Sequence, residues 1–167
     1  LSYRYIIQSV REVNILYMAK ERNKVVPASY LILRRDGKIL LLRRFNTGYE
    51  DGNYSVVAGH VDSGETFTET IIRESKEEAG IDIDPKNLKV VHVMHRDSGE
   101  SDGLNERVDV FLEATEWDGD MENREPHKCD DLSWFDMADL PENIIPYIRS
   151  AVECIRDGVF YSEYGWK

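Results

Sequence analysis

The chain contains few of the residues that mark secreted or membrane-spanning proteins. Two cysteines in 167 residues, Cys129 and Cys154, make no disulfide framework, so both are expected to be reduced thiols. No apolar run approaches the ~20 residues that span a bilayer, and no signal peptide pattern is visible. The sequence therefore predicts a cytoplasmic protein that does not bind a membrane.

Basic residues are also scarce, with 21 Lys and Arg against 32 Asp and Glu and a net charge of −11. A nucleic-acid polymer is bound best by a basic surface, so no such partner is expected. A small phosphorylated partner remains compatible with this charge. Between Glu50 and Asp84, however, ten acids are accompanied by only two bases, Arg73 and Lys76. A polyphosphate would be repelled there unless divalent cations bridged it to the carboxylates.

The composition that remains is that of an ordinary globular protein, with 41% hydrophobic and 32% charged residues. A length of 167 residues predicts one domain over 1–167, with its core at about 27–156. Hydrophobic patterning predicts strands over 28–34, 38–44, 54–57, 88–95, 107–115 and 132–135. Residues 10–19 fit a strand or a short helix, and both remain open. The expected class is α/β, with a mixed sheet between two helices.

One of those helices is defined by its end signals. Thr66 followed three residues later by Glu69 is a capping box, and Gly80 fits the position that ends a helix. The second helix is expected over 143–156, where Ile145, Ile148, Val152 and Ile155 recur at helical spacing. The aromatic tail that follows could cover the core or form part of a homodimer interface.

The first helix carries Glu74, Glu77 and Glu78 at spacing i, i+3, i+4, which places three carboxylates on one face. Like charges at this spacing destabilise a helix, whereas clustered carboxylate oxygens suit Mg²⁺ or Mn²⁺. The alternative is a solvated charged face, which the spacing of Arg73 to Glu69 and Glu77 supports. That spacing leaves Glu74 and Glu78 without a basic partner and so favours a metal site.

The segment Gly59 to Ile81, GHVDSGETFTETIIRESKEEAGI, resembles the box of the Nudix family, G-x5-E-x7-R-E-U-x-E-E-x-G-U, where U is aliphatic. Ser75 departs from the pattern at an aliphatic position and is interpreted as a packing variant. The matching positions are Gly59, Glu65, Arg73, Glu74, Glu77, Glu78, Gly80 and Ile81. The resemblance implies an α/β/α sandwich that hydrolyses a nucleoside diphosphate linked to another moiety, X.

The resemblance also implies roles for the acids. Glu77 and Glu78 would be metal ligands, Glu74 a further ligand or the general base, and the carbonyl of Ala58 another ligand. Glu125 is the candidate for a distant ligand, against the alternative of a solvated loop acid. Glu113 and Glu116 are weaker rivals.

Other box residues are implied to be structural. Glu65 and Arg73 would form an ion pair between the loop and the helix. Gly59 and Gly64 would allow a backbone conformation that other residues would strain.

Phosphate binding is implied for Arg44, at the end of a strand directed toward the box, with Arg43 as its rival. The alternative is that Arg44 is a surface arginine at a strand end. Tyr54, Phe45, Tyr49 and Trp134 are candidates for stacking against a base, and each could instead be core or rim.

The markers of particular Nudix subfamilies suggest a nucleoside triphosphate as substrate. The ADP-ribose proline, a dinucleoside polyphosphate tyrosine and the SQPWPFPxS array of NADH hydrolases are missing. The segment from Glu125 to Pro141 resembles MutT-like enzymes, which release a monophosphate and pyrophosphate. The alternatives are an ADP-ribose or nucleotide-sugar pyrophosphatase, an isopentenyl diphosphate isomerase and a non-catalytic sensing domain.

Overall fold

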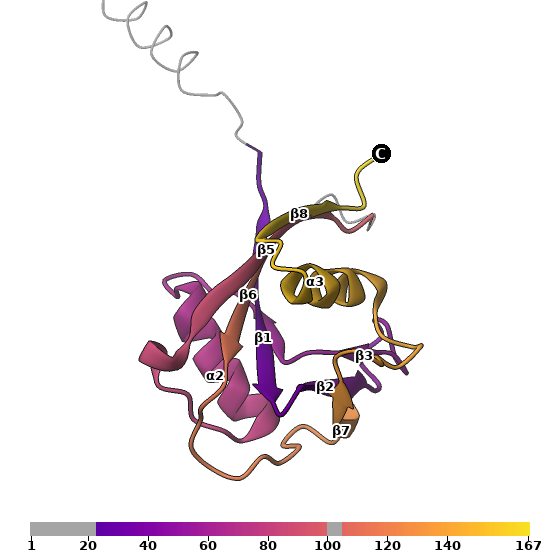
Figure 1. Cartoon of the computed structure of the whole chain (residues 1–167). Coiled ribbons are helices and arrows are strands. Elements are labelled where there is room, and N and C mark those ends of the chain that lie inside the picture. The colour runs from indigo at the N-terminus through magenta and orange to yellow at the C-terminus, as the bar shows by residue number, and fades with distance from the viewer. Residues whose placement is uncertain (1–22, 100–104) are drawn as a thin grey trace, which may run out of the picture.

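The part of the chain that the structure describes forms an eight-stranded mixed sheet with one helix on each side, as the computed structural model in Figure 1 shows. The structure describes residues 23–99 and 105–167, so the segment 10–19 lies outside the described residues. Helix α2 (Phe67–Ala79) covers one face and helix α3 (Pro146–Arg156) the other. This arrangement confirms the predicted α/β/α sandwich. Neither helix is long and apolar enough to cross a bilayer.

The strands run in the order β3-β2-β1-β6-β5-β8, with β4 beside β1 and β7 beside β2. Strands β1 and β6 are parallel, as are β5 and β8, and the other pairs are antiparallel. A short 3₁₀ helix, η1 (Pro85–Asn87), precedes β5. The bounds are β1 Val26–Arg35, β2 Lys38–Arg44, β3 Tyr54–Ser55, β4 Ala58–His60, β5 Lys89–Asp97, β6 Glu106–Ala114, β7 Cys129–Asp136 and β8 Tyr161–Tyr164.

Strands β1 and β2 are paired only near their turn, where Arg34 lies opposite Ile39. Farther from the turn, β1 pairs with β4, placing Tyr30 opposite Ala58, and β2 pairs with β3 and β7. The strand that the sequence predicts over 54–57 is shorter in the structure, where β3 ends at Ser55. The next strand, β4, begins at Ala58 and pairs with β1, whereas β3 pairs with β2. The divergence brings the end of β2 and strand β4 to the same end of the molecule.

The core has two layers because β1 is buried on both faces. Tyr30 and Ile32 join the cluster that packs under α3, and Leu31 and Leu33 join the cluster that packs under α2. This alternation follows from the period of two along a strand. The sequence of a strand that is buried on both faces is an almost continuous run of apolar residues.

Helix α2 has the predicted bounds. Thr66 and Glu69 form the reciprocal capping box, and Gly80 ends the helix in the left-handed conformation at φ 70°. Ser75 is fully buried, and its hydroxyl donates a hydrogen bond to the carbonyl of Ile72 at 2.8 Å. Since its polar group has a partner, serine at this position costs packing volume without leaving an unsatisfied donor.

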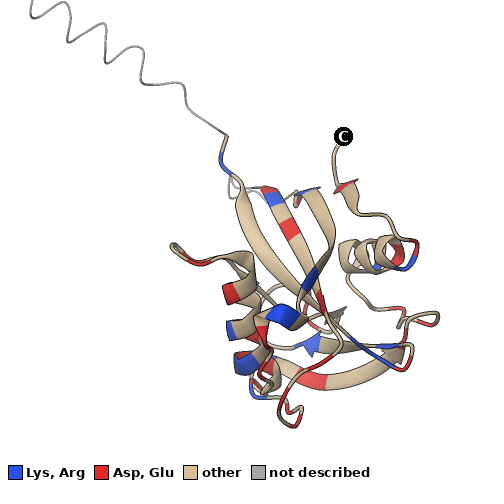
Figure 2. Ribbon diagram, turned by 60° about the vertical axis from the view of Figure 1, so that its left-hand side comes forward, with Lys and Arg blue, Asp and Glu red and all other residues tan. Residues whose placement is uncertain are grey.

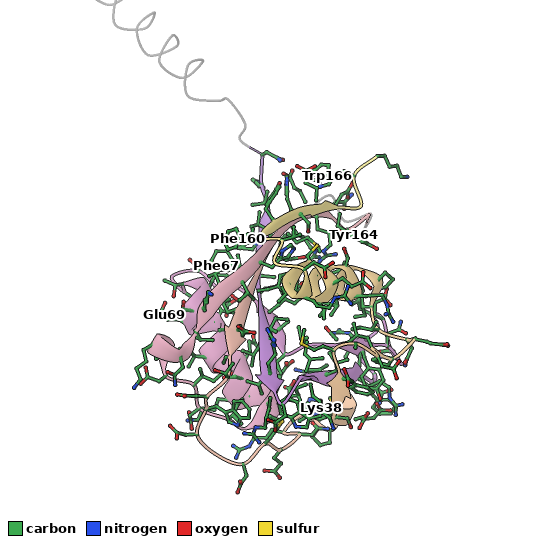
Figure 3. The ribbon with its side chains drawn as sticks, in the orientation of Figure 1. Lys38, Phe67, Glu69, Phe160, Tyr164 and Trp166 are labelled. Atoms are coloured by element: carbon green, nitrogen blue, oxygen red, sulfur yellow. The ribbon has the colours of Figure 1, made fainter. Side chains whose placement is uncertain are left out.

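The aromatic tail forms the outer strand of the sheet. Strand β8 runs parallel to β5, and Tyr164 packs against the α3 side of the core. Figure 3 shows Phe160, Tyr164 and Trp166 around β8, away from Lys38 at the start of β2. Phe160 is 58% exposed. The tail thus covers part of the core, and the homodimer stays a prediction.

Candidate active site

Four carboxylates line one pocket of about 570 Å³, which we call the acidic pocket. Glu74, Glu77 and Glu78 come from α2, and Glu125 comes from the loop before β7. Figure 2 shows the acidic residues of α2 in red among its basic ones. The remaining lining residues are Leu42, Arg44, Asn46, Thr47, Ala58, His127, Lys128, Cys129 and Leu132.

Glu78 anchors the helix to β4 at this pocket. The backbone N–H of Ala58 donates a hydrogen bond to its carboxylate at 3.3 Å. Burial raises the pKa of Glu78 to about 8, and the neighbouring charge of Glu74 acts in the same direction. Burial also raises the pKa of Glu74, against the opposing effect of Arg73. Partly desolvated carboxylates of like charge are stabilised in their ionised form by a cation.

The donor set fits a hard divalent cation because it consists of carboxylate and carbonyl oxygens. In residues 23–99 and 105–167, no three acidic, histidine or cysteine side chains converge tightly enough to enclose an ion. Three of the carboxylates approach the pocket from α2, and Glu125 approaches it from the loop before β7.

Gly59 is required for close approach and does not have the role predicted for it. Its φ is not in the left-handed region, in contrast to Gly64 at φ 93°. A Cβ on Gly59 would lie 2.0 Å from Oε1 of Glu74. The expectation of backbone freedom was therefore wrong for Gly59. Glycine leaves the space that the carboxylate of Glu74 occupies.

The predicted ion pair between Glu65 and Arg73 forms. Arg73 donates through Nε and Nη2 to the two oxygens of Glu65, at 2.9 and 3.1 Å. These bonds hold the pKa of Glu65 down at about 2. The same guanidinium donates to Glu74 at 2.6 Å. Arg73 therefore fixes the loop before α2 and orients one catalytic candidate.

Glu125 joins the cluster from far along the chain, as the sequence predicted. Its carboxylate accepts a hydrogen bond from Nζ of Lys128 at 2.7 Å. The rival Glu113 is paired with Arg34 at 2.6 Å, and neither Glu113 nor Glu116 lines the acidic pocket. The position of Glu125 supports a ligand role, which remains a prediction.

Arg44 is placed as predicted, and Arg43 is not available. The Arg44 guanidinium donates to the carbonyl of Tyr49 at 2.7 Å and to the hydroxyl of Thr47 at 3.0 Å. Arg43 is directed to the other side of β2, where it forms a two-point ion pair with Asp130. Adjacent residues on a strand point to opposite faces, so only Arg44 borders the acidic pocket.

A second pocket, of about 410 Å³, adjoins the first through Arg44 and Ala58. We call it the cationic pocket because, among residues 23–99 and 105–167, three arginines and no carboxylate line it. Its lining residues are Ala28, Tyr30, Arg44, Tyr49, Ser55, Ala58, Gly59, His60, Arg96, Arg107 and Tyr147.

Arg96, which lines the cationic pocket, was not predicted as a site residue from the sequence. A signal was present, because His92, Met94 and Arg96 alternate along β5 and so share a buried face.

Tyr54 is a core residue, and its predicted stacking role is wrong. It is buried, its hydroxyl donates to Asp131, and its ring meets the edge of Phe135 at 4.8 Å. Tyr54 lines neither of the two pockets. The sequence alone could not decide whether Tyr54 belongs to the core or lines a pocket, because an aromatic residue near the box is compatible with both positions.

The other aromatic candidates divide in the same way. Trp134 stacks on Trp117 with ring centroids 6.1 Å apart, away from both pockets. Phe45 is exposed outside them. Only Tyr49 lines the cationic pocket, where its ring lies 5.3 Å from the guanidinium carbon of Arg44.

Comparison with known proteins agrees with this geometry. The model of the NUDIX domain matches residues 23–153, so the chain belongs to the Nudix hydrolase family. A solved MutT NUDIX hydrolase from Burkholderia pseudomallei superposes with a TM-score of 0.70 at 26% identity, covering 78% of this chain and 98% of that one. A solved UDP-X diphosphatase, at 18% identity and a TM-score of 0.59, shares the fold, covering 94% and 75% of the two chains.

Curated relatives include proteins named NAD-capped RNA hydrolase NudC. The one from Chromobacterium violaceum is 31% identical over 140 residues, which is 80% of this chain and 49% of the relative. The one from Vibrio atlanticus is 28% identical, over 71% of this chain and 40% of the relative. The chain thus spans about half or less of the length of these relatives. The SQPWPFPxS array of NADH hydrolases is missing from this sequence.

Proposed function

We propose that the protein hydrolyses a nucleoside diphosphate-X, most readily a (deoxy)nucleoside triphosphate to the monophosphate and pyrophosphate. The observation that carries this proposal is the acidic pocket, in which four carboxylates and Arg44 meet from three separate parts of the chain. Phosphate oxygens repel a nucleophile, so a site that hydrolyses a diphosphate must supply positive charge and a proton acceptor. The acidic pocket offers residues for both tasks.

The residues that would hold Mg²⁺ or Mn²⁺ are Glu77, Glu78, Glu125, Glu74 and the carbonyl of Ala58. A divalent cation bound there would neutralise phosphate charge and lower the pKa of a coordinated water.

The protein's own groups would complete the reaction. A water oxygen forms a new bond to phosphorus, the bridging P–O bond breaks, and the bridging oxygen leaves with the departing phosphate. A carboxylate accepts the water proton, and Glu74 is suited to this because Arg73 occupies only its Oε1 among the described residues. Glu74 as a further ligand remains the alternative. Arg44 would neutralise and orient the phosphates at the junction of the two pockets.

A second candidate is a substrate with a nucleotide or sugar on each side of the diphosphate, such as a dinucleotide or ADP-ribose. Two adjoining pockets on either side of Arg44 and Ala58 favour it, because each could receive one half. The NudC relatives are named as hydrolases of NAD-capped RNA, which points to NAD-containing substrates of those proteins. The absence of the SQPWPFPxS array from this sequence favours the triphosphate.

The test is product release from a matched panel with Mg²⁺ or Mn²⁺ and an EDTA control. The panel contains canonical and oxidised dNTPs, NADH, ADP-ribose, UDP-glucose and diadenosine polyphosphates. Pyrophosphate from a triphosphate, lost in EDTA, is the expected result. Turnover of NADH or ADP-ribose alone would replace the first candidate by the second. No turnover of any compound would contradict both.

A further inference from the structure

Arg96 is an arginine whose surroundings fix it in place while leaving part of it open to the cationic pocket. It lies on β5, is only 4% exposed and lines the pocket wall. Its Nε donates to Oδ2 of Asp109 on β6 at 2.7 Å. Its guanidinium carbon lies 3.9 Å from the ring centroid of Tyr147 at the start of α3. A strand, an ion pair and an aromatic face therefore restrict the group from three directions.

The bond from Arg96 to Asp109 uses Nε. The two terminal nitrogens of Arg96 make no hydrogen bond to the described residues, so they can donate to a ligand. A guanidinium is planar and donates two parallel hydrogen bonds to two adjacent acceptors. A guanidinium that is already held in place loses little conformational freedom when it binds a ligand.

Stability alone does not account for this pair. Asp109 is fully buried, and burial raises the pKa of its carboxyl against the opposing charge of Arg96. Desolvating two charges is costly, and replacing a buried ion pair by apolar residues of similar volume is often neutral or stabilising. Because Arg96 lines a pocket of about 410 Å³, a role in binding a ligand would explain why the buried pair is present.

We propose that Arg96 determines substrate specificity by binding two adjacent hydrogen-bond acceptors on the part of the substrate that enters the cationic pocket. This inference rests on the proposed function, because it assigns the half of the substrate that does not lie over the carboxylates. Asp109 and Tyr147 are positioning residues, since they hold the guanidinium. The pocket shares Arg44 and Ala58 with the acidic pocket, so one ligand can occupy both.

Two kinds of group offer this acceptor pair. The O6 and N7 edge of guanine accepts two bonds from one arginine, whereas adenine presents a donor beside N7. Two oxygens of a phosphate accept the same fork. Three arginines in a chain of net charge −11 would attract either a phosphate or an electron-rich base edge.

The pair Arg34–Glu113 provides a matched control. It also joins an arginine to an acid across neighbouring strands, at 2.6 Å between β1 and β6. The Arg34 side chain is 41% exposed and lines neither of the two pockets. Arg34→Met therefore removes a cross-strand ion pair of the same type without changing either pocket.

The experiment is calorimetric titration of the whole chain in EDTA with GMP, AMP and pyrophosphate as separate probes. Without metal the carboxylates repel phosphate, so binding depends on the cationic pocket. If the base edge is the ligand, GMP binds about tenfold more tightly than AMP and Arg96→Met abolishes the difference. If a phosphate is the ligand, GMP and AMP bind equally, and Arg96→Met weakens pyrophosphate about tenfold.

Arg96→Lys, which keeps the charge and loses the fork, should remove the preference for GMP and preserve part of the affinity for pyrophosphate. Arg34→Met should change none of these values. Because Arg96→Met leaves Asp109 unpaired, the double variant Arg96→Met, Asp109→Leu is measured beside it, with thermal unfolding as the check of folding. Equal affinities of wild type and a folded Arg96 variant for all three probes would overturn the inference.

The binding measurement does not depend on turnover. If the panel shows no hydrolysis while binding still depends on Arg96, the proposed function fails and the Arg96 inference stands. If a triphosphate is hydrolysed and binding is independent of Arg96, the proposed function stands and the Arg96 inference fails.

Discussion

The acidic and cationic pockets share a wall and have opposite chemistry. Among the described residues, the acidic pocket is lined by four carboxylates from α2 and a distant loop, and the cationic pocket by three arginines without a carboxylate. Arg44 and Ala58 belong to both. The acids require a cation before they can receive phosphate, whereas the arginines can receive an anion or a base edge without metal. Under the two proposals, hydrolysis depends on the acidic pocket and recognition on the cationic pocket, so substitutions should remove each alone.

The largest effect is expected from the acidic pocket. Glu77→Gln and Glu78→Gln should each lower kcat by about 10³-fold, because the uncharged carboxamide of glutamine is a poor metal ligand and a poor base. Metal-free binding in the cationic pocket should be unchanged. The measurement is steady-state hydrolysis with Mg²⁺ together with calorimetry in EDTA. Glu122→Gln, which alters an exposed acid outside both pockets, is the control. Near-normal kcat in Glu77→Gln would remove that residue from the metal site.

Gly59→Ala should lower kcat by about 10²-fold, because the added Cβ would lie 2.0 Å from Oε1 of Glu74 and must displace it. Comparison of kcat and thermal unfolding separates this effect from misfolding. Gly48→Ala is the control, since a Cβ there meets nothing within 4 Å, although its φ of 79° adds strain. Full activity in a folded Gly59→Ala protein would show that the position of Glu74 does not matter.

Arg44→Ala tests the shared wall. It should raise KM for a polyphosphate about tenfold with a smaller change in kcat, because the phosphate loses a charged partner. Arg43→Ala should leave KM unchanged, since that guanidinium is directed to Asp130. The reverse pattern would assign phosphate binding to Arg43.

Glu125→Ala should shift the Mg²⁺ concentration for half-maximal activity upward by about tenfold, because one ligand oxygen donor is lost. The measurement is a metal titration at saturating substrate. Glu113→Ala, which removes an acid paired elsewhere on the sheet, should not shift it. An unchanged titration in Glu125→Ala would make Glu125 a loop acid.

The smallest effect concerns stability and pH. The pKa of Glu78 is about 8 in the folded protein, above its ordinary value of 4.5. The folded state thus retains a proton that the unfolded state loses, so stability decreases as pH rises from about 4.5 to 8. In EDTA the Tm should fall by about 5 °C between pH 5 and 8, and Glu78→Gln should flatten this dependence. An equal slope in Glu78→Gln would assign the effect to other groups.

Local signals predicted helix α2 and its acidic face well. Thr66, Glu69 and Gly80 fixed the bounds of α2, since capping depends on neighbouring backbone groups. The spacing of Glu74, Glu77 and Glu78 placed them together because residues three and four apart share a helix face. Glu125 needed a family pattern, since no local rule connects a loop acid to a helix far away.

The cationic pocket was not predictable in this way. It draws lining residues from strands β1 to β6, helix α3 and the loop after β2, so no short segment contains its pattern. Tyr54 and Tyr49 are alike in the sequence, yet the first is buried in the core and the second lines the pocket.

The sequence by itself determined the sandwich, the bounds of α2 and the row of acids, because period, caps and i, i+4 spacing are local properties of the chain. The tertiary structure alone decided that Glu74 occupies the space above Gly59, that Arg44 and Ala58 join two pockets, and that Arg96 meets Asp109 and Tyr147. These contacts depend on the divergence of β1 from β2 and on strand registers, which are set by packing over the whole sheet.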